Sequence, residues 1–160
     1  MKVLIACEYS GIVRDAFTRK GHDAWSCDIL PTESQGNHIQ GNVLEHLDKN
    51  WDLMIAHPPC THLAVSGARW FTEGKKPWSL QIEALDFVRK LLDAPIEKIA
   101  LENPVSVIST KIRKPDIIEK DGYKMSRHHW ETFRLPSKIR GKVRSRFYEG
   151  IAEAMADQWG

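Results

Sequence analysis

Short apolar runs, each stopped abruptly by turn-forming residues, constrain the fold of this chain more than any other feature. The first run, Val3 to Cys7, leads almost directly to Ser10 and Gly11. Apolar runs of this length between Gly, Pro, Asn or Asp residues are typical of strands buried in a parallel sheet. The same pattern predicts four further strands, at residues 24–27, 38–41, 51–56 and 96–101.

Two of the intervening segments have the periodicity of amphipathic helices. The first carries an apolar face and ends near Gly21; this face consists of Ile12, Val13, Ala16 and Phe17. The second is expected to run from an N-cap at Ser79 to about Leu92, before Pro95. Strand and helix therefore alternate. This order predicts an α/β fold with a Rossmann-like, mostly parallel sheet and helices on both faces.

The chain length of 160 residues accommodates one domain with a proper core, so residues 1–160 are expected to form a single domain. No apolar stretch is long enough to span a membrane. The N-terminus has the pattern of a first strand and not of a secretory signal, which predicts a cytoplasmic protein. The three cysteines, Cys7, Cys27 and Cys60, lack CxxC spacing, so neither a disulfide framework nor a zinc ribbon is indicated.

The net charge of +2 is unevenly distributed along the chain. Residues 111–146 hold 12 of the 23 Lys and Arg residues but only 4 of the 21 Asp and Glu residues. A polyanion is attracted to such a segment by counterion release, so we expect this irregular basic segment to contact nucleic acid. The alternative is a solvated tail. Helical periodicity returns in a final helix with a predicted inner face of Ile151, Ala154, Met155 and Trp159.

Ligands on parallel α/β sheets bind outside the carboxyl ends of the strands. The residues that directly follow the predicted strands are therefore the candidates for a functional site. In the first two-thirds of the chain, the short motifs with reactive or polar side chains fall at these positions: Glu8–Gly11, Asp28, Asn42, His57–Cys60 and Glu102–Pro104.

Cys60 is the candidate nucleophile. Pro58 and Pro59 restrict the backbone directly after a strand and hold the next side chain at a defined angle over the strand ends. Glu102 follows another strand, so its carboxylate is expected beside Cys60 at the same edge of the sheet. The alternatives are that Cys60 is a small buried hydrophobe, which suits the two other cysteines better, and that Glu102 favours a helix N-terminus.

These motifs resemble those of the cytosine-5 DNA methyltransferases. Pro58-Pro59-Cys60 is similar to the Pro-Cys nucleophile motif of that family, and Glu102-Asn103 is similar to its Glu-Asn-Val motif, in the same order. Residues 6–17 resemble the first family motif, Phe-x-Gly-x-Gly, with Gly11 in register and Tyr9 in place of the first glycine. Residues 144–159 resemble the closing motif. The resemblance covers about two-thirds of the chain and is closest to short phage-type members.

The resemblance implies transfer of a methyl group from S-adenosylmethionine to carbon 5 of cytosine in DNA. The Cys60 thiolate would add to carbon 6 and so activate carbon 5, while Glu102 would hydrogen-bond ring nitrogen N3 and the amino group. The target base has to be flipped out of a duplex or presented in a single strand. The thiolate requires a lowered pKa, for which nearby Arg69 or a helix N-terminus is the expected cause.

The resemblance also implies the remaining site residues. Arg146 is assigned a catalytic role, because Arg144-Ser145-Arg146 takes the place of part of the family's Gln-x-Arg-x-Arg motif. The cofactor is expected against residues that follow the first four strands: Glu8, Tyr9, Ser10, Gly11, Asp28, Ile29, Asn42, Val43 and Pro58. DNA is expected against basic residues of the loop 61–78 and of the basic segment: Arg69, Lys75, Lys76, Lys124, Arg127, Lys142 and Arg144.

About forty residues separate Asn103 from the closing motif, too few for the target-recognition region of family members. A second copy of the chain or a separate partner would then supply DNA recognition. Two other functions stay open: a methyltransferase fold that binds nucleic acid without turnover, and a methyltransferase acting on exocyclic amines. We expect no metal, although a zinc site formed by His57, Cys60 and His62 is a further alternative.

Overall fold

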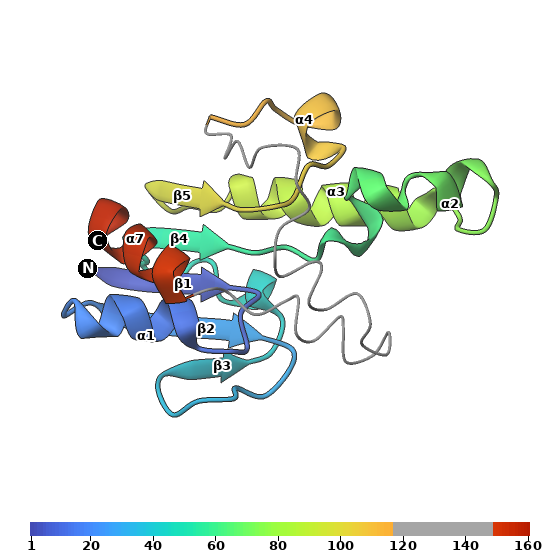
Figure 1. Ribbon diagram of the computed structural model, residues 1–160. Coiled ribbons are helices and arrows are strands. Elements are labelled where there is room, and N and C mark those ends of the chain that lie inside the picture. The colour runs from blue at the N-terminus through green and yellow to red at the C-terminus, as the bar shows by residue number, and fades with distance from the viewer. Residues whose placement is uncertain (117–148) are drawn as a thin grey trace.

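The computed structural model describes residues 1–116 and 149–160, and the strands in these residues form one parallel sheet. The strand order is β3-β2-β1-β4-β5 (Figure 1). The prediction of a parallel α/β sheet is confirmed, and the strand ends differ from those expected by at most two residues. The strands are β1 (Lys2–Ala6), β2 (Asp23–Asp28), β3 (His38–Gln40), β4 (Leu53–Ala56) and β5 (Lys98–Leu101).

The register of the sheet brings the carboxyl ends of four strands level with one another. Ala6 at the end of β1 pairs with Cys27 of β2 on one side and with Ala56 of β4 on the other. Ala56 in turn pairs with Leu101, the last residue of β5. The segments that follow these strands therefore leave the sheet at the same edge, as the sequence predicts.

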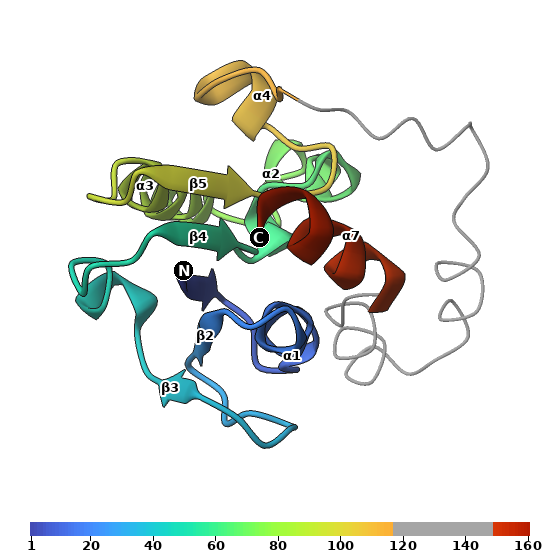
Figure 2. The same cartoon turned by 90° about the vertical axis from the view of Figure 1, so that its left-hand side faces the viewer.

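Helices cover both faces of the sheet, with α1 and α7 on one face and α3 on the other (Figure 2). In the described part of the chain, no helix has both the length and the apolar character needed to cross a membrane. The α-helices are α1 (Ile12–Arg19), α2 (Arg69–Thr72), α3 (Ser79–Leu92), α4 (Ile108–Lys111) and α7 (Glu149–Trp159). Short 3-10 helices form at η1 (Val43–Glu45), η2 (Cys60–His62) and η3 (Val65–Gly67).

The first face of the sheet packs against α1 and α7. Alternate residues of β1, Val3 and Ile5, point to this face because side chains alternate along a strand. They contact the predicted inner face of α1 together with the buried residues of α7: Val13, Ala16, Phe17, Ala152, Met155 and Ala156. Each fully buried large side chain here contributes roughly 1.5–3 kcal/mol to folding.

Ion pairs add to the contact between α1 and α7, which lie near opposite ends of the sequence. Arg19 in the last turn of α1 pairs with Glu153, and Lys20 directly after α1 pairs with Asp157. These four side chains are exposed, so the pairs add little to the free energy of unfolding. The apolar contact between the two helices is what holds α7 beside the sheet.

The opposite face of the sheet packs against α3. The other set of strand residues, Leu4 and Ala6 of β1 with Met54 of β4, points to this face. Leu91 near the end of α3 and Ile96 in the connection to β5 cover them. The alternation of the strand residues thus explains why both faces are apolar and both carry helices.

Three local predictions are wrong. Ser79 is the first residue of α3 and Trp78 takes the N-cap, because a turn with a hydrogen bond from Gln81 N–H to Trp78 O at 3.0 Å begins the helix earlier. Ala154 is exposed, because α7 presents the flanking alanines of the same helix to the core. Cys7 is the last residue of the first predicted strand, but it lies just beyond β1 with φ 62°, where the chain turns out of the sheet.

Candidate functional site

The loop after β4 presents Cys60 at the carboxyl edge of the sheet. The backbone N–H of His57 donates to Ala6 O at 2.9 Å, which extends the pairing of β4 with β1 by one residue. Pro58 is buried and Pro59 has φ −54, so the chain turns directly into η2. Cys60 is the first residue of η2 and is half-buried. Its position past the strand end is the one that the sequence predicts.

The loop after β5 contacts the Cys60 loop through the second motif. The backbone N–H of Glu102 donates to Ala56 O of β4 at 2.9 Å. The next residue, Asn103, donates from its side-chain Nδ2 to Pro58 O, also at 2.9 Å. The structure therefore joins the Pro-Pro-Cys segment and the Glu-Asn segment directly, although 45 residues separate Asn103 from Pro58.

A second set of contacts holds the two loops together farther from the sheet. Val65 N–H donates to Val105 O at 3.1 Å, and Val107 N–H donates to Leu63 O at 3.0 Å. Between them, Ala64 and Ser106 form an antiparallel bridge. Because backbone pairs restrict both loops, the side chains that they carry have a defined relative position.

The electrostatic surroundings of Cys60 differ from those expected. Burial raises the pKa of the Cys60 thiol above its ordinary value, and the negative charge of Glu102 raises it further, while a backbone hydrogen bond at Cys60 itself lowers it. The guanidinium of Arg69 lies over the Trp70 ring at 4.6 Å, and Arg69 is not among the groups that shift this pKa. The expectation of a thiol with a lowered pKa is therefore wrong.

Glu102 has a second titratable neighbour in His57. Nδ1 of His57 lies 3.8 Å from Oε2 of Glu102. The imidazole is 8% exposed and the carboxylate is 47% exposed. The carboxylate thus has the buried His57 ring on one side and is accessible to a ligand from the solvent.

Side chains of the turn after β1 form hydrogen bonds to the start of α1. The carboxylate of Glu8, which is 4% exposed, accepts hydrogen bonds from Val13 N–H at 2.8 Å and Arg14 N–H at 3.2 Å. Ser10 Oγ donates to the same carboxylate at 3.0 Å. An acid in this position satisfies amide groups that the helix leaves unpaired and interacts favourably with the helix dipole. The side chains of Glu8 and Ser10, predicted to meet a cofactor, therefore cap α1.

Gly11 leaves room for a buried arginine. It has φ 77, and a Cβ at this position would overlap Ser34 Oγ and the guanidinium of Arg14. Arg14 is 1% exposed and its Nη2 donates to Ser34 Oγ at 2.6 Å and to Gln35 O at 2.9 Å. Its Nη1 donates to Ser26 Oγ at 3.2 Å. Arg14 thereby ties the loop after β2 to α1, a role that the sequence pattern does not reveal.

The segment after β2 offers the surface that best fits a nucleoside. Asp28 is half-buried at the end of β2, and its Oδ1 accepts a hydrogen bond from Leu30 N–H at 2.9 Å. Ile29 beside it is 74% exposed. An acid next to an exposed apolar side chain suits ribose hydroxyls and the flat face of a base. The residues present therefore fit the nucleoside part of S-adenosylmethionine.

The remaining cofactor candidates have structural partners. Asn42 is the N-cap of η1, where its Oδ1 accepts from Leu44 N–H at 3.2 Å. Val43 is buried in the core on the α3 face of the sheet. Tyr9 is buried, and its carbonyl accepts from Glu33 N–H at 2.9 Å. The side chains of Asn42 and Val43 and the backbone of Tyr9 therefore contribute to the fold.

The loop 61–78 projects from the carboxyl edge of the sheet as a lobe that contains α2 (Figure 1). Trp70 lies between two cations, with the guanidinium carbon of Arg69 4.6 Å and Nζ of Lys75 4.8 Å from its ring centroid. Both cations are exposed. Two of the three nucleic-acid contacts predicted in this loop therefore lie together with an aromatic ring on this lobe, which we call the α2 lobe (residues 61–78).

A second aromatic pair connects the α2 lobe to the rest of the domain. Phe71 is buried and its ring stacks on Trp78 at 5.3 Å, while Lys76 Nζ lies 5.7 Å from the Phe71 ring. Trp78 remains 55% exposed. Phe71 therefore anchors the α2 lobe, while Trp78 keeps an exposed ring surface.

Several predicted residues lie outside the described part of the chain: Lys124, Arg127, Lys142, Arg144 and Arg146. Within residues 1–116 and 149–160, no group of three or more His, Cys, Asp or Glu side chains lies where it could hold a metal ion. In these residues, His57, Cys60 and His62 therefore do not form the zinc site considered above.

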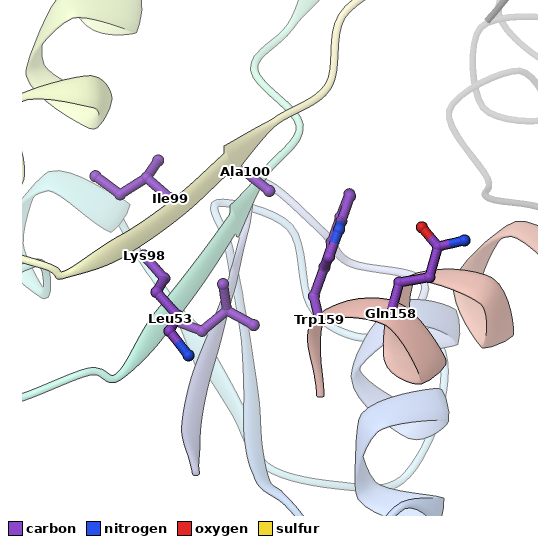
Figure 3. A pocket seen from close by; sticks show the side chains of 6 residues that line it. All are labelled: Leu53, Lys98, Ile99, Ala100, Gln158 and Trp159. Carbon is purple, nitrogen blue, oxygen red and sulfur yellow. The ribbon is translucent and has the colours of Figure 1, made fainter. Parts of the chain in front are cut away.

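A hollow of about 300 Å³ lies away from these motifs, between the sheet and the end of α7 (Figure 3). Leu53 and Lys98, which begin β4 and β5, place it toward the amino ends of the strands. It contains none of the predicted site residues. Its lining consists of Leu53, Lys98, Ile99, Ala100, Gln158 and Trp159.

Comparison of the chain with models of protein families, with curated proteins and with solved structures gave no significant match.

Proposed function

We propose that this protein is a DNA cytosine methyltransferase-like enzyme, which transfers a methyl group from S-adenosylmethionine to carbon 5 of cytosine through a covalent adduct with Cys60. The observation that carries the proposal is the direct contact between the two motifs. Asn103 Nδ2 donates to Pro58 O at 2.9 Å, and Glu102 acts electrostatically on Cys60. A nucleophile and a carboxyl group beside one another are what addition to a pyrimidine ring requires.

The residues of the site have complementary roles in this reaction. The Cys60 thiol gives its proton to the Glu102 carboxylate, and the sulfur forms a bond to carbon 6. The electrons of the C5=C6 and C4=N3 double bonds shift toward N3, which takes the proton from Glu102. Glu102 is accessible to the ring, and its carboxylate also accepts a hydrogen bond from the amino group. S-adenosylmethionine supplies the methyl group to carbon 5. Solvent then takes the carbon 5 proton, the electron pair of that bond re-forms the C5=C6 double bond as the sulfur departs, and N3 returns its proton to Glu102.

The proposed position of the cofactor is at the carboxyl edge of the sheet. Asp28 and Ile29 after β2 would hold the nucleoside, with Pro58 and the backbone at Gly11 on the β1 side. The α2 lobe would hold the DNA strand through Arg69 and Lys75, because exposed cations beside aromatic rings are typical of surfaces that bind unpaired nucleotides.

Methyl transfer to DNA tests the proposal. We expect label from S-adenosylmethionine to appear in DNA as 5-methylcytosine with the wild-type protein and to be absent with Cys60→Ala. Cys27→Ala serves as the matched control, because Cys27 is buried in the core on the α3 face of the sheet. Label in an exocyclic amine would instead support the alternative class of methyltransferase. Methyl transfer to carbon 5 at the full rate in Cys60→Ser would contradict the proposed mechanism.

A second candidate function is nucleic-acid binding without turnover. One observation favours it: the pKa of the Cys60 thiol is raised, which reduces the fraction of the reactive thiolate at neutral pH. In that case the protein binds DNA through the α2 lobe, and no label is transferred at any pH.

A further inference from the structure

His57 lies between the two motifs and has no role in the reaction as described so far. Its imidazole Nδ1 is 3.8 Å from Glu102 Oε2, and its side chain is 8% exposed. The backbone N–H groups of His57 and Glu102 donate to Ala6 O and Ala56 O, each at 2.9 Å. Both backbones are therefore fixed to adjacent strands, and the buried ring has a defined position beside the carboxyl group.

The carboxyl group itself is less restricted than the ring. Glu102 is 47% exposed, and a long exposed side chain populates several rotamers. Its proposed role requires one orientation, with one oxygen directed at the cytosine ring. A neighbour that donates a hydrogen bond to the other oxygen would select this orientation. His57 is placed to do so, although 3.8 Å is longer than a closed hydrogen bond and has to shorten when a base is bound.

We propose that His57 is a positioning residue for Glu102, whose carboxyl group it orients toward the ring of the target base through a hydrogen bond from Nδ1 to Oε2. This inference rests on the proposed function. It adds a residue that the motifs of the family resemblance do not include, since His57 precedes the Pro-Pro-Cys segment.

The proton and electron balance of the step is simple. The other oxygen of the Glu102 carboxylate takes up the proton of the Cys60 thiol. As the bond from Sγ of Cys60 to carbon 6 forms, N3 receives this proton and Glu102 is again a carboxylate. The hydrogen bond from His57 at Oε2 is stronger to this ionised acceptor than to the neutral acid. When the sulfur departs, N3 returns the proton to Glu102. His57 thus keeps the carboxyl group in the orientation that proton transfer to N3 requires, which lowers the barrier to addition.

The test measures the rate at which the protein forms a covalent adduct with single-stranded DNA that contains 5-fluorocytosine, in the presence of S-adenosylmethionine. The rate is measured at saturating DNA, and DNA affinity is measured separately. We expect His57→Phe, which keeps a ring but has no N–H donor, to slow adduct formation about 10- to 100-fold with unchanged DNA affinity. His57→Asn places an amide donor near the position of Nδ1 and is expected to regain part of the rate.

Two controls separate positioning from a general effect on folding. His22→Phe makes the same substitution beside the N-terminus, where His22 Nδ1 lies 3.3 Å from the terminal amino group, and is expected to leave the rate unchanged. In the Glu102→Gln background, His57→Phe is expected to have little further effect, because residues that act through one another are not additive.

The outcomes are distinguishable. A wild-type protein that forms no adduct overturns the proposed function, and the inference with it. If the wild-type protein reacts, the inference alone is overturned by an unchanged rate in His57→Phe, by an equal loss in the Glu102→Gln background, or by a change in DNA affinity alone. If His57→Phe does not fold, the comparison of His57→Asn with the wild-type protein and Glu102→Gln decides the question in the same way.

Discussion

Asn103 donates a hydrogen bond of 2.9 Å from its side-chain Nδ2 to the backbone carbonyl of Pro58, across 45 residues of sequence. Pro58 lies two residues before Cys60, and Asn103 directly follows Glu102. This bond therefore couples the position of the candidate nucleophile to that of the candidate acid.

Removal of this bond is expected to affect both stability and reactivity. Asn103→Ala leaves the half-buried Pro58 carbonyl without its donor, so the free energy of unfolding should fall by about 1 kcal/mol. Adduct formation should slow by more than the change in stability explains, because the two loops lose their alignment. Urea unfolding and adduct kinetics measure the two effects. Asn37→Ala, at an exposed position before β3, is the control, and equal behaviour of the two variants would contradict the prediction.

Two features require a glycine at position 11: the positive φ and the close approach of the Arg14 and Ser34 side chains. Gly21 has a similar φ of 85, but a Cβ there meets no atom within 4 Å. Gly21→Ala should therefore cost about 1–2 kcal/mol for the left-handed backbone alone. Gly11→Ala should cost roughly 1–3 kcal/mol more, because the new Cβ overlaps the buried guanidinium. Thermal and urea unfolding compare the two variants. Equal losses would show that Arg14 is not tightly packed against Gly11.

The pH dependence of Cys60 reactivity follows from the direction of its pKa shift. Burial and the charge of Glu102 raise the pKa, so at neutral pH the thiol is mostly protonated and reacts slowly. The rate of alkylation by iodoacetamide should still be rising at pH 9.0, the ordinary pKa for a cysteine. Mass spectrometry of the Cys60 peptide separates this rate from those of Cys7 and Cys27, for which burial raises the pKa to about 12 and about 11.

The same measurement tests the proximity of Glu102 to the thiol. Glu102→Gln removes a negative charge that raises the pKa of Cys60, so the thiolate fraction and the alkylation rate at a given pH should increase. Glu97→Gln, an exposed acid before β5, should have no effect. A rate that is unchanged or lower in Glu102→Gln would mean that the carboxylate does not act on Cys60.

The α2 lobe is expected to contribute electrostatic binding energy for DNA. Arg69→Gln and Lys75→Gln should each weaken binding of single-stranded DNA and lower the slope of log K against log salt concentration by about 0.7, if each cation neutralises one phosphate. Trp78→Ala should weaken binding with little change in this slope, because stacking does not release counterions. Titrations at several salt concentrations measure both quantities. Lys20→Gln, beside α7, provides the control.

The fold and the edge of the sheet that carries the motifs were predictable from the sequence, because both depend on local patterns. Apolar runs such as Val3–Ala6 specify buried strands, and parallel strands place their following residues at a common edge. Cys60 and the Glu102–Asn103 segment therefore come together as expected. The partners of individual side chains were not predictable in this way. The bond from Asn103 to Pro58 and the approach of His57 to Glu102 depend on the register of β4 and β5, which no local pattern contains.

The turn after β1 illustrates the same limit. The sequence places Glu8 and Ser10 at the edge of the sheet, which is correct, but it does not distinguish a ligand contact from a helix cap. The structure shows that both side chains bind the start of α1. Likewise, the sequence does not reveal that the charged Arg14 is buried, since its partners Ser26, Ser34 and Gln35 come from segments 12 or more residues away.

The central claim, that Cys60 is the nucleophile of a cytosine-directed reaction, is tested most directly by mass spectrometry of the protein after incubation with S-adenosylmethionine and DNA containing 5-fluorocytosine. The fluorine at carbon 5 prevents the elimination that normally releases the enzyme, so a nucleophile that adds to carbon 6 stays attached. The account predicts a stable protein–DNA adduct that maps to the peptide containing Cys60 and is absent in Cys60→Ala. An adduct at another residue, or none under conditions in which the protein binds both DNA and S-adenosylmethionine, would contradict it.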